Sequence, residues 1–554
     1  MPPSGGATFD ESCRRRSHRR TRLLIEDENE DDEENDFHRR STMYKPPDSN
    51  PPRMNRRALL KGAAGAGLGM TVGPLARSIL AESAPARRNL IRTENEKQGT
   101  TDWMLSNTRV DPRAKYRCPC IEGYCPRNSV RAGEPLEIMV STNPPSSFVI
   151  DLYRMGYYGG KGGRHLTQLG PFKGTVQPDP QIGEERLREC RWEPATKIVI
   201  PSDWPSGVYL GKLTAEKGKL QSYVIFIVRD DRACDFLFQS SDTTWSAYNR
   251  WPSTWSMYDD GTKDVQGWYV GPGVRVSWDR PYGKYRQVLD QPLSQGSGSF
   301  LLWEFPLSYW MEREGYDVSY ISNVDTHADG KGLLRAKAWL SVGHDEYWSL
   351  DMFDNVKAAV AAGVNAAFFS GDICWGVIPF LPSGTGAPHR VISRIGMFGP
   401  IDERDLENWP ELLKFKLHAP TEATLIGARN IYPYNGTADW ICTDEGHWIY
   451  EGTGMRNGDT IPGLVGFEWM GNPADIPGLR VVARGMVRSG SAEGQYTATI
   501  YPGPKENFVF NAASIWWSDG LSAPPGYIRP SKRLQGSDRR VERITANLLN
   551  RFRG

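Results

Sequence analysis

The pattern of hydrophobic and polar residues changes part-way along the chain. Between about residues 115 and 230, short runs of β-branched and aromatic residues are separated by Gly, Pro and Ser, as in SFVIDLYRMGYYGG and LQSYVIFIVRDD. No long stretch of this region has helical periodicity, so the pattern predicts strands throughout. We therefore expect an immunoglobulin-like β-sandwich over residues 115–230.

From about residue 233, apolar strands of five to seven residues alternate with helical segments. The strand candidates are CDFLFQS, YDVSYIS, AWLSV and VNAAFFS. In the helical stretch SLDMFDNVKAAVAAG, Ser349 suits the N-cap and Gly363 suits the C′ position. Repeated alternation of this kind predicts a parallel sheet with crossover helices over residues 233–400.

The last part of the chain, residues 401–554, returns to strand-like text punctuated by Gly and Pro, such as LRVVARGMVRSG and NFVFNAASIWW. A closing helix is predicted where Val541, Ile544, Leu548 and Phe552 recur at spacings of three or four. The fold class expected is α+β and multidomain: an N-terminal sandwich, an α/β parallel-sheet domain and a β-rich C-terminal extension.

The first 86 residues are not expected to belong to the fold. Residues 1–53 contain basic, acidic and Pro-rich blocks, which predict either disorder or a wrongly assigned start. Residues 54–86 combine paired Arg56 and Arg57, a weakly apolar Gly/Ala run and an Ala-Pro-Ala ending. This arrangement resembles a twin-arginine signal peptide and is too broken for a spanning helix. It predicts export to the periplasm or the outside of the cell.

The overall composition limits the kinds of partner that the protein is expected to bind. The chain has 554 residues, a net charge of +1 and 24% charged residues, a balance that indicates neither nucleic acid nor a membrane surface as a partner. Three of its eight cysteines, Cys118, Cys120 and Cys125, lie within eight residues. No fourth ligand follows at zinc-finger spacing, so a loop disulfide is the prediction for an exported protein.

Polar residues follow each of the four predicted strands of the parallel sheet. Ligands bind outside the carboxyl ends of such strands, because the loops that leave them meet there. We therefore expect one crevice to contain Asp242, Asp325, His344, Glu346 and Asp372. The alternative is that each strand-end acid only caps the next helix. Clustered acids repel one another unless a cation or hydrogen bonds offset them, so a bound metal is expected.

The residues near this crevice favour a hard cation. The sequence after residue 86 has six histidines and no HExxH spacing, and it has no G-x-S-x-G nucleophile motif. The loops instead offer carboxylate and phenol oxygens, at Tyr248, Tyr282, Glu346 and Tyr347. Such ligands suit ferric iron better than zinc.

Several motifs in matching order carry a family resemblance over roughly residues 115–554. The motifs are QSSDTTWSAYNRW, SWDRPY, LSVGHDEYWS, GVNAAFFSGD and VFNAASIWW followed by GLSAPPGY. Together they resemble the large (β) subunit of N,N-dimethylformamidase and its relatives. The resemblance implies an immunoglobulin-like region, an α/β region similar to the glutamine amidotransferase sheet, and a mononuclear iron, taken as Fe3+, held by two tyrosines and one glutamate.

The resemblance also assigns roles to residues. It implies Glu346 as the carboxylate ligand, His344 as its partner and Tyr248 and Tyr282 as the phenol ligands, with Tyr285 or Tyr347 as alternatives to either tyrosine. Asp372 stands where the family pattern has Asn, and it is a candidate catalytic residue together with His344. The candidate substrate-binding residues are Asp242, Asn249, Asp325 and Trp348.

The expected activity is hydrolysis of a small amide or another C–N bond by an iron-activated water, with His344 or Asp372 moving the proton. The expected partners are a small amide-like substrate and either a small helical subunit or further copies of the chain. The alternative function is a non-catalytic carbohydrate-binding protein of the cell envelope. The tryptophans of these loops fit either a pocket wall or the core; they are Trp245, Trp251, Trp348 and Trp375.

Overall fold

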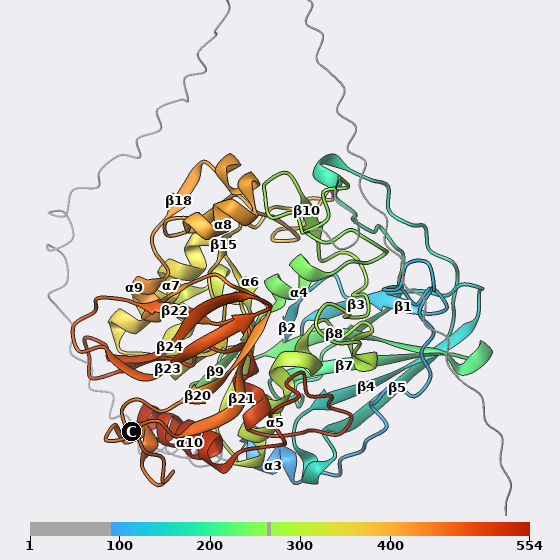
Figure 1. The fold of residues 1–554 in the computed structure, drawn as a ribbon. Helices are drawn as coiled ribbons and strands as arrows, with labels where there is room; N and C mark the ends of the chain where they lie inside the picture. The colour runs from blue at the N-terminus through green and yellow to red at the C-terminus, as the bar shows by residue number, and fades with distance from the viewer. Residues whose placement is uncertain (1–89, 263–267) are drawn as a thin grey trace, which may run out of the picture. The chain divides into compact units, whose positions relative to one another are not determined.

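The computed structural model describes residues 90–262 and 268–554 (Figure 1). The segment 1–53 and the predicted twin-arginine signal lie outside the described residues. The described part is a mixed α+β structure that is rich in sheet, with a β-rich C-terminal region. None of the described helices is long and apolar enough to cross a membrane.

The N-terminal region contains two sheets that share one apolar core. Alternate residues of β3 (Pro135–Ser141) and β4 (Ser147–Met155), such as Leu136 and Ile150, are fully buried between the sheets. The three-stranded sheet has the order β1-β3-β6 and the five-stranded sheet the order β2-β8-β7-β4-β5. Their other strands are β1 (Glu122–Tyr124), β2 (Ser129–Arg131), β5 (Gly163–Lys173), β6 (Pro194–Val199), β7 (Gly207–Ala215) and β8 (Gln221–Arg229). The likeness of this region to an immunoglobulin domain remains a prediction.

A nine-stranded sheet forms the centre of the rest of the molecule. Its order is β11-β9-β12-β14-β25-β24-β23-β20-β21, parallel from β11 to β25 and antiparallel from β25 onward. The parallel strands are β9 (Cys234–Ser240), β11 (Val318–Ser322), β12 (Ala336–His344), β14 (Asn365–Gly371) and β25 (Phe508–Asn511). The antiparallel strands are β20 (Gly436–Ile441), β21 (Thr460–Phe467), β23 (Arg480–Ser489) and β24 (Ala492–Pro502). Most of the strands after residue 400, namely β20, β21, β23, β24 and β25, therefore extend the same sheet.

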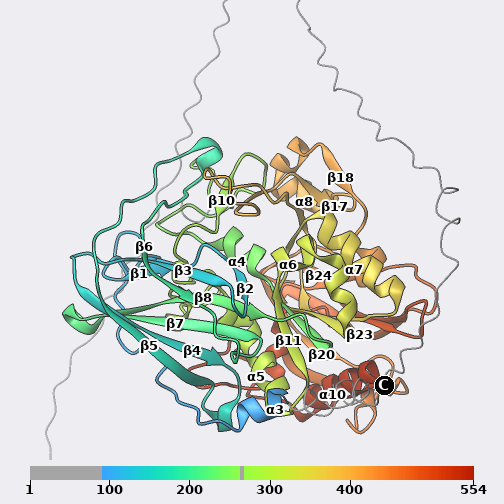
Figure 2. The same cartoon turned by 180° about the vertical axis from the view of Figure 1, so that it is seen from behind.

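Helices cover both faces of this sheet. In Figures 1 and 2, α7 (Leu350–Ala362) lies above the sheet and α10 (Arg539–Arg553) lies below it. The caps of α7 agree with the pattern, since the Ser349 side chain accepts from the Met352 N–H and Gly363 has a φ of 109°. The apolar stripe of α10 is buried, as its spacing indicates. The other α-helices are α3 (Leu90–Asn95), α4 (Asp242–Tyr248), α5 (Phe305–Arg313), α6 (Asn323–Ala328), α8 (Glu403–Asn408) and α9 (Ala423–Ile426).

Short strands complete the described structure. A four-stranded sheet of order β13-β15-β17-β18 consists of β13 (Tyr347–Trp348), β15 (Gly376–Val377), β17 (Gly396–Phe398) and β18 (Leu417–Ala419). Two-stranded pairs are formed by β10 (Arg275–Ser277) with β16 (Val391–Ser393) and by β19 (Ala428–Asn430) with β22 (Met470–Pro473). The seven described cysteines are all free thiols, so the predicted loop disulfide among Cys118, Cys120 and Cys125 is absent from the described residues.

Candidate active site

A cavity of about 310 Å3 lies at the carboxyl ends of β12 and β14. Its polar lining includes Tyr248, Tyr258, Glu346, Asp372 and Glu468. Its apolar wall is mostly aromatic and includes Trp268, Trp375, Trp409, Tyr434 and Phe467. The cavity therefore combines an acidic, phenolic floor with walls that would hold an apolar group and exclude water.

The sequence GHDEYWS contains the end of β12, a short turn at Asp345 and Glu346, and the strand β13. Gly343 has a φ of 79°, and a Cβ there would lie 2.8 Å from the Cβ of Trp303, so only glycine fits this position. The Asp345 carboxylate accepts hydrogen bonds from Ser341 Oγ at 2.7 Å and Gln239 Nε2 at 2.8 Å, and it anchors the turn. The residues on either side of it meet each other, with 3.3 Å between His344 Nε2 and Glu346 Oε2.

Two phenol oxygens lie beside the Glu346 carboxylate. The Tyr258 hydroxyl lies 2.7 Å from Glu346 Oε1 and 2.8 Å from the Tyr248 hydroxyl. We call Tyr248, Tyr258 and Glu346 the tyrosine–glutamate cluster. Burial, followed by the charge of Glu346, raises the pKa of both phenols well above the usual value. Without a cation the phenols therefore stay protonated at neutral pH, whereas a bound cation would favour the phenolates.

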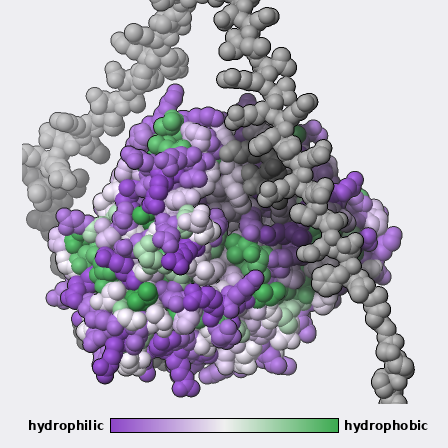
Figure 3. All heavy atoms as spheres, viewed as in Figure 1, coloured by the Kyte–Doolittle hydropathy of each residue, from purple (hydrophilic) through white to green (hydrophobic). Residues whose placement is uncertain are grey.

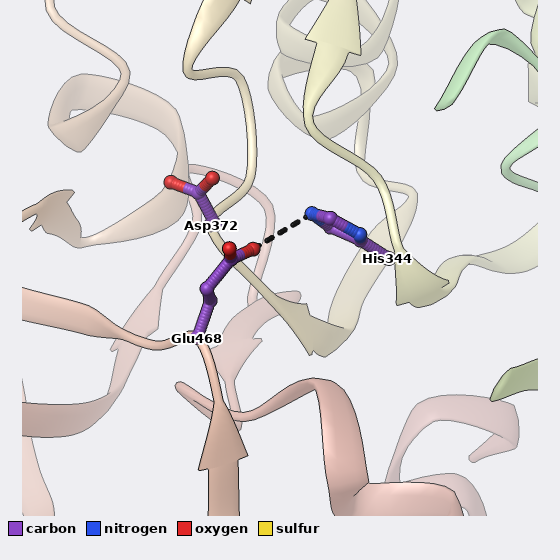
Figure 4. Close-up of side chains that lie close together, drawn as sticks. All are labelled: His344, Asp372 and Glu468. Carbon is purple, nitrogen blue, oxygen red and sulfur yellow. Dashed lines mark ion pairs between the residues drawn. The ribbon is translucent and has the colours of Figure 1, made fainter. Parts of the chain in front are cut away.

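Next to this cluster is a group of three residues that could hold a metal ion. One ligand atom from each of His344, Asp372 and Glu468 lies within 4.8 Å of the others, and all three residues are buried (Figure 4). We call these residues the acidic triad. His344 Nε2 is 2.9 Å from Glu468 Oε2. Asp372 follows β14 directly, with a φ of 49°, and Glu468 follows the end of β21.

The charges of the acidic triad are unbalanced. Burial, followed by repulsion from Glu468 and Glu346, raises the pKa of Asp372 well above its usual value. Burial also raises the pKa of Glu468, although His344 opposes this effect. For His344, burial lowers the pKa, but the two glutamates outweigh it and raise the pKa to about 9. Glu346 and Glu468 thus share the His344 imidazole, and Asp372 has no cationic partner among the described residues, which is an arrangement that a cation would stabilise.

Two of the predicted crevice acids have structural roles instead. The Asp242 carboxylate accepts hydrogen bonds from the Asn323 backbone N–H at 2.8 Å and from the Asn128 side chain. Asp325 forms a capping box with Ser322 at the start of α6, and it also pairs with Arg229 at 3.0 Å. Helix capping, the alternative reading of strand-end acids, therefore describes Asp325, and neither acid lines the cavity among the described residues.

The remaining substrate-binding candidates also lie in the framework. Asn249 Nδ2 donates to the Pro281 carbonyl at 2.9 Å, and its Oδ1 accepts from the Gly283 N–H at 3.0 Å. Trp348 is fully buried and packs edge-on against Trp339, with 5.6 Å between ring centroids. Both residues hold chain segments together rather than facing the cavity.

The structure places Tyr282 away from the tyrosine–glutamate cluster. Its loop is fastened by Arg280, whose guanidinium donates to the carbonyls of Trp251 and Ser277 at 3.0 Å each. Tyr282 packs edge-on against Trp245, with 6.2 Å between ring centroids, and lines a separate, smaller cavity. Tyr258 therefore occupies the place beside Tyr248 that was predicted for Tyr282.

The other aromatic candidates divide between the site and the core. Tyr285 is buried and packs against Trp303, at 5.9 Å between centroids, but its hydroxyl has no hydrogen-bond partner among the described residues, and the charges of Glu468 and Glu346 add to burial in raising its pKa, so it stays a candidate ligand. Trp245 Nε1 donates to Glu304 at 2.7 Å and Trp251 Nε1 donates to Glu122 at 2.8 Å, which are both buried structural contacts. Of the four tryptophans considered from the sequence, Trp375 is the one that lines the cavity within the described residues.

Sequence reasoning missed two site residues. Tyr258 lies in the irregular segment SMYDDG, which has no strand or motif to single it out. Glu468 lies in LVGFEWM, where a lone carboxylate in an apolar run was a usable signal, because charged residues are seldom buried without a partner or a ligand.

A family model described as N,N-dimethylformamidase beta subunit-like, C-terminal, matches residues 149–531. The chain belongs to this family. The resemblance inferred from the motifs is therefore confirmed, and membership suggests a hydrolase. The match spans every residue of the tyrosine–glutamate cluster and of the acidic triad. A search of curated proteins found no match.

Proposed function

We propose that this protein is an iron-dependent hydrolase that cleaves a small amide or another C–N bond with a metal-activated water. The observation that carries the proposal is the tyrosine–glutamate cluster, in which the Tyr258 hydroxyl lies within 2.8 Å of oxygens of both Tyr248 and Glu346 at a cavity wall. Family membership supports a hydrolase, because the matching family is named for N,N-dimethylformamidase.

The residues present fit iron. Two phenols and a carboxylate are hard oxygen donors, and such donors suit a highly charged cation. The raised pKa of both phenols means that the cluster can form phenolates only when a cation offsets them. Tyr248, Tyr258 and Glu346 would hold the ion, with Tyr258 in the position that the sequence had assigned to Tyr282. When bound, the iron would supply Lewis acidity and a lowered pKa for a water ligand.

The residues around the cluster position the proton and the substrate. His344 Nε2 faces Glu346 at 3.3 Å and Glu468 at 2.9 Å, so it can hold a proton between the two carboxylates and pass it to a leaving amine. Asp372, at the same cavity, is the second candidate proton carrier. The aromatic walls, including Trp375 and Phe467, would receive the alkyl or aryl groups of the substrate and exclude bulk water.

Iron content and colour test the assignment. Full-length protein produced with iron is expected to contain one iron per chain and to absorb visible light through the phenolates. Tyr258→Phe and Tyr248→Phe should each lower the iron content and weaken and shift the visible band, because each removes one of the two phenolates. Tyr282→Phe is the matched control, since it removes a phenol from a neighbouring loop, and it should keep both iron and colour. An unchanged band in Tyr258→Phe together with a weakened and shifted band in Tyr282→Phe would overturn the assignment.

Activity tests the substrate class. A panel of formamides, acetamides and ureas is incubated with the iron-loaded protein, and the release of amine is measured. Glu346→Ala should abolish both iron binding and amine release, because it removes the carboxylate that joins the cluster to His344. A stable, colourless, iron-free protein that binds glycans would favour the carbohydrate-binding alternative.

We also propose that the protein is exported and that it associates with a second subunit. The paired Arg56 and Arg57 support passage through a twin-arginine route, which would deliver an already folded, iron-loaded protein outside the cytoplasm. A small helical subunit or a second copy of the chain is proposed from the family resemblance alone.

A further inference from the structure

We propose that His344, Asp372 and Glu468 form a second cation site, specific for a borderline divalent ion such as Zn2+, and that its occupation inhibits the enzyme. This site goes beyond the single iron of the proposed function. Its ligands come from three chain segments: the end of β12, the residue after β14 and the turn between β21 and β22 (Figure 4).

The geometry is close to that of a bound ion. The ligand atoms lie within 4.8 Å of one another, and His344 Nε2 is already 2.9 Å from Glu468 Oε2. Zinc bonds of about 2.0–2.2 Å bring neighbouring ligand atoms to roughly 3–4 Å from each other.

The Asp372 carboxylate gives a second, independent indication that the triad binds a cation. Its side chain is 3% exposed, and its Oδ1 atom is buried with no hydrogen-bond partner among the described residues. No lysine or arginine within residues 90–262 and 268–554 forms an ion pair with it. Buried carboxylates without a hydrogen-bond partner are costly, and those that persist are commonly paired or bind metals.

The charges of the triad ligands favour a divalent ion over a trivalent one. A trivalent ion at Tyr248, Tyr258 and Glu346 would be neutralised by two phenolates and one carboxylate, so the first site leaves no positive charge for the triad. The carboxylates of Asp372 and Glu468 carry two negative charges that one divalent ion would balance, with a neutral His344 as the third ligand. An imidazole nitrogen among oxygen donors favours Zn2+ over Mg2+ or Ca2+.

Occupation of the triad would have a functional consequence. A nitrogen that ligates a metal cannot hold a proton, and the same applies to a ligating carboxylate oxygen. A bound ion would therefore withdraw both candidate proton carriers, His344 and Asp372, from the reaction. This inhibition rests on the proposed function, whereas the binding of the ion does not.

The binding test uses the full-length, iron-loaded protein and zinc alone. Equilibrium dialysis followed by metal analysis should find one zinc per chain in addition to the iron, with the visible band unchanged. Asp372→Asn keeps the shape of the side chain and removes one charge, and it should weaken zinc binding by at least tenfold while the band persists. Glu468→Gln should do the same. The persisting band reports that each variant is folded.

The same binding measurements are made on a control variant and with Mg2+ in place of zinc. Asp519→Asn changes another aspartate, 1% exposed, that lies outside the triad and has no triad residue among the groups that affect its pKa, and it should leave zinc binding unchanged. Mg2+ in place of zinc should not bind at stoichiometric levels. Equal zinc affinity in the wild type and in Asp372→Asn would overturn the site, as would displacement of the iron by zinc.

Inhibition is measured separately, as amine release with and without one equivalent of zinc. Wild type should be inhibited and Asp372→Asn should be resistant in whatever activity it retains. Zinc binding without inhibition would overturn the inhibitory role and keep the site. Absence of iron and of activity, with zinc still bound at the triad, would overturn the proposed function and keep the site.

Discussion

Tyr347 contacts the tyrosine–glutamate cluster through Tyr258 but is not among the described residues that line the cavity. Its hydroxyl accepts a hydrogen bond from Arg394 Nε at 3.1 Å and lies 2.5 Å from the Tyr258 hydroxyl. The other nitrogens of Arg394 donate to backbone carbonyls, including that of Met257 at 2.9 Å, so the guanidinium is fixed in place. Tyr347 therefore orients Tyr258 and would donate a hydrogen bond to its phenolate.

Tyr347→Phe removes this hydroxyl and keeps the ring in its buried site. We expect iron affinity to fall by about 10- to 100-fold, the range typical of residues that support a metal ligand from outside. The visible band should persist and move to longer wavelength, because a phenolate that has lost a donor gives up its electrons more easily. Iron titration and visible spectra measure both effects. Loss of band intensity at full iron loading would instead make Tyr347 a ligand.

At this scale, the sequence predicted the site residues that follow the parallel strands and missed Tyr258, which lies in a loop, and Glu468, which follows an antiparallel strand. Glu346, His344 and Asp372 could be predicted from the sequence because the carboxyl ends of parallel strands must share an edge. Tyr258 could not be, since an irregular loop has no periodicity from which to infer where it folds back. Asp242 and Asp325 satisfied the same strand-end rule but face hydrogen-bond donors of the framework, and only coordinates distinguish the two outcomes.

Among the elements, α7 follows directly from local sequence signals. Ser349 caps its start, and Gly363 ends it in the left-handed region, where the Gly363 N–H reaches the carbonyls of Ala359 and Val360. The helix starts one residue after the β13 strand that carries Tyr347, so its position bears on the site.

Gly363→Ala tests the value of this helix end. A φ of 109° is strained for any residue with a Cβ, and the added atom would lie 3.2 Å from the Lys505 Cβ. We expect the free energy of unfolding to fall by about 1–2 kcal/mol, measured by urea denaturation. Gly490→Ala is the control for strain alone, since it also has a positive φ but no atom within 4 Å. A smaller loss for Gly363→Ala than for Gly490→Ala would contradict the contribution of the contact.

The alternation of strands and helices was predictable because buried hydrophobic residues recur with a period of 2 in strands and 3.6 in helices. The two-residue strands β13 and β15 were not, because so short a strand contains no period. Their pairing nevertheless fixes the segment that follows Glu346, since Tyr347 pairs with Gly376.

For the whole molecule, the decisive unknown was which distant strands pair. β14 and β25 lie side by side in the central sheet although more than a hundred residues separate them, and this pairing joins the parallel and antiparallel halves. Local patterns fix the type of each strand but not its neighbour, so a sequence boundary near residue 400 was a natural inference. The sheet instead runs through that position and brings the Glu468 turn to the ends of β12 and β14.

A buried ion pair joins the N-terminal sheets to the central region. Arg154 of β4 and Glu312 of α5 are fully buried and connected by two hydrogen bonds of 2.9 Å. Tyr320 Oη donates to the same carboxylate at 2.9 Å, and the Ser206 carbonyl accepts from Arg154 at 2.8 Å. The pair thus ties strands of the first region to a helix and a strand of the second.

Glu312→Gln would leave the buried Arg154 guanidinium without its direct carboxylate partner, with Glu94 as the remaining acidic neighbour, linked through the Tyr158 hydroxyl. We expect a loss of about 3–5 kcal/mol in the free energy of unfolding, since removal of one partner of a buried pair leaves the other desolvated. Glu493→Gln is the matched control, because its partner Arg488 is 73% exposed, and it should cost less than about 1 kcal/mol. Urea denaturation followed by tryptophan fluorescence measures both variants. Equal losses would show that Arg154 finds another partner when Glu312 is neutral, and that the two regions are held together by their shared apolar core instead.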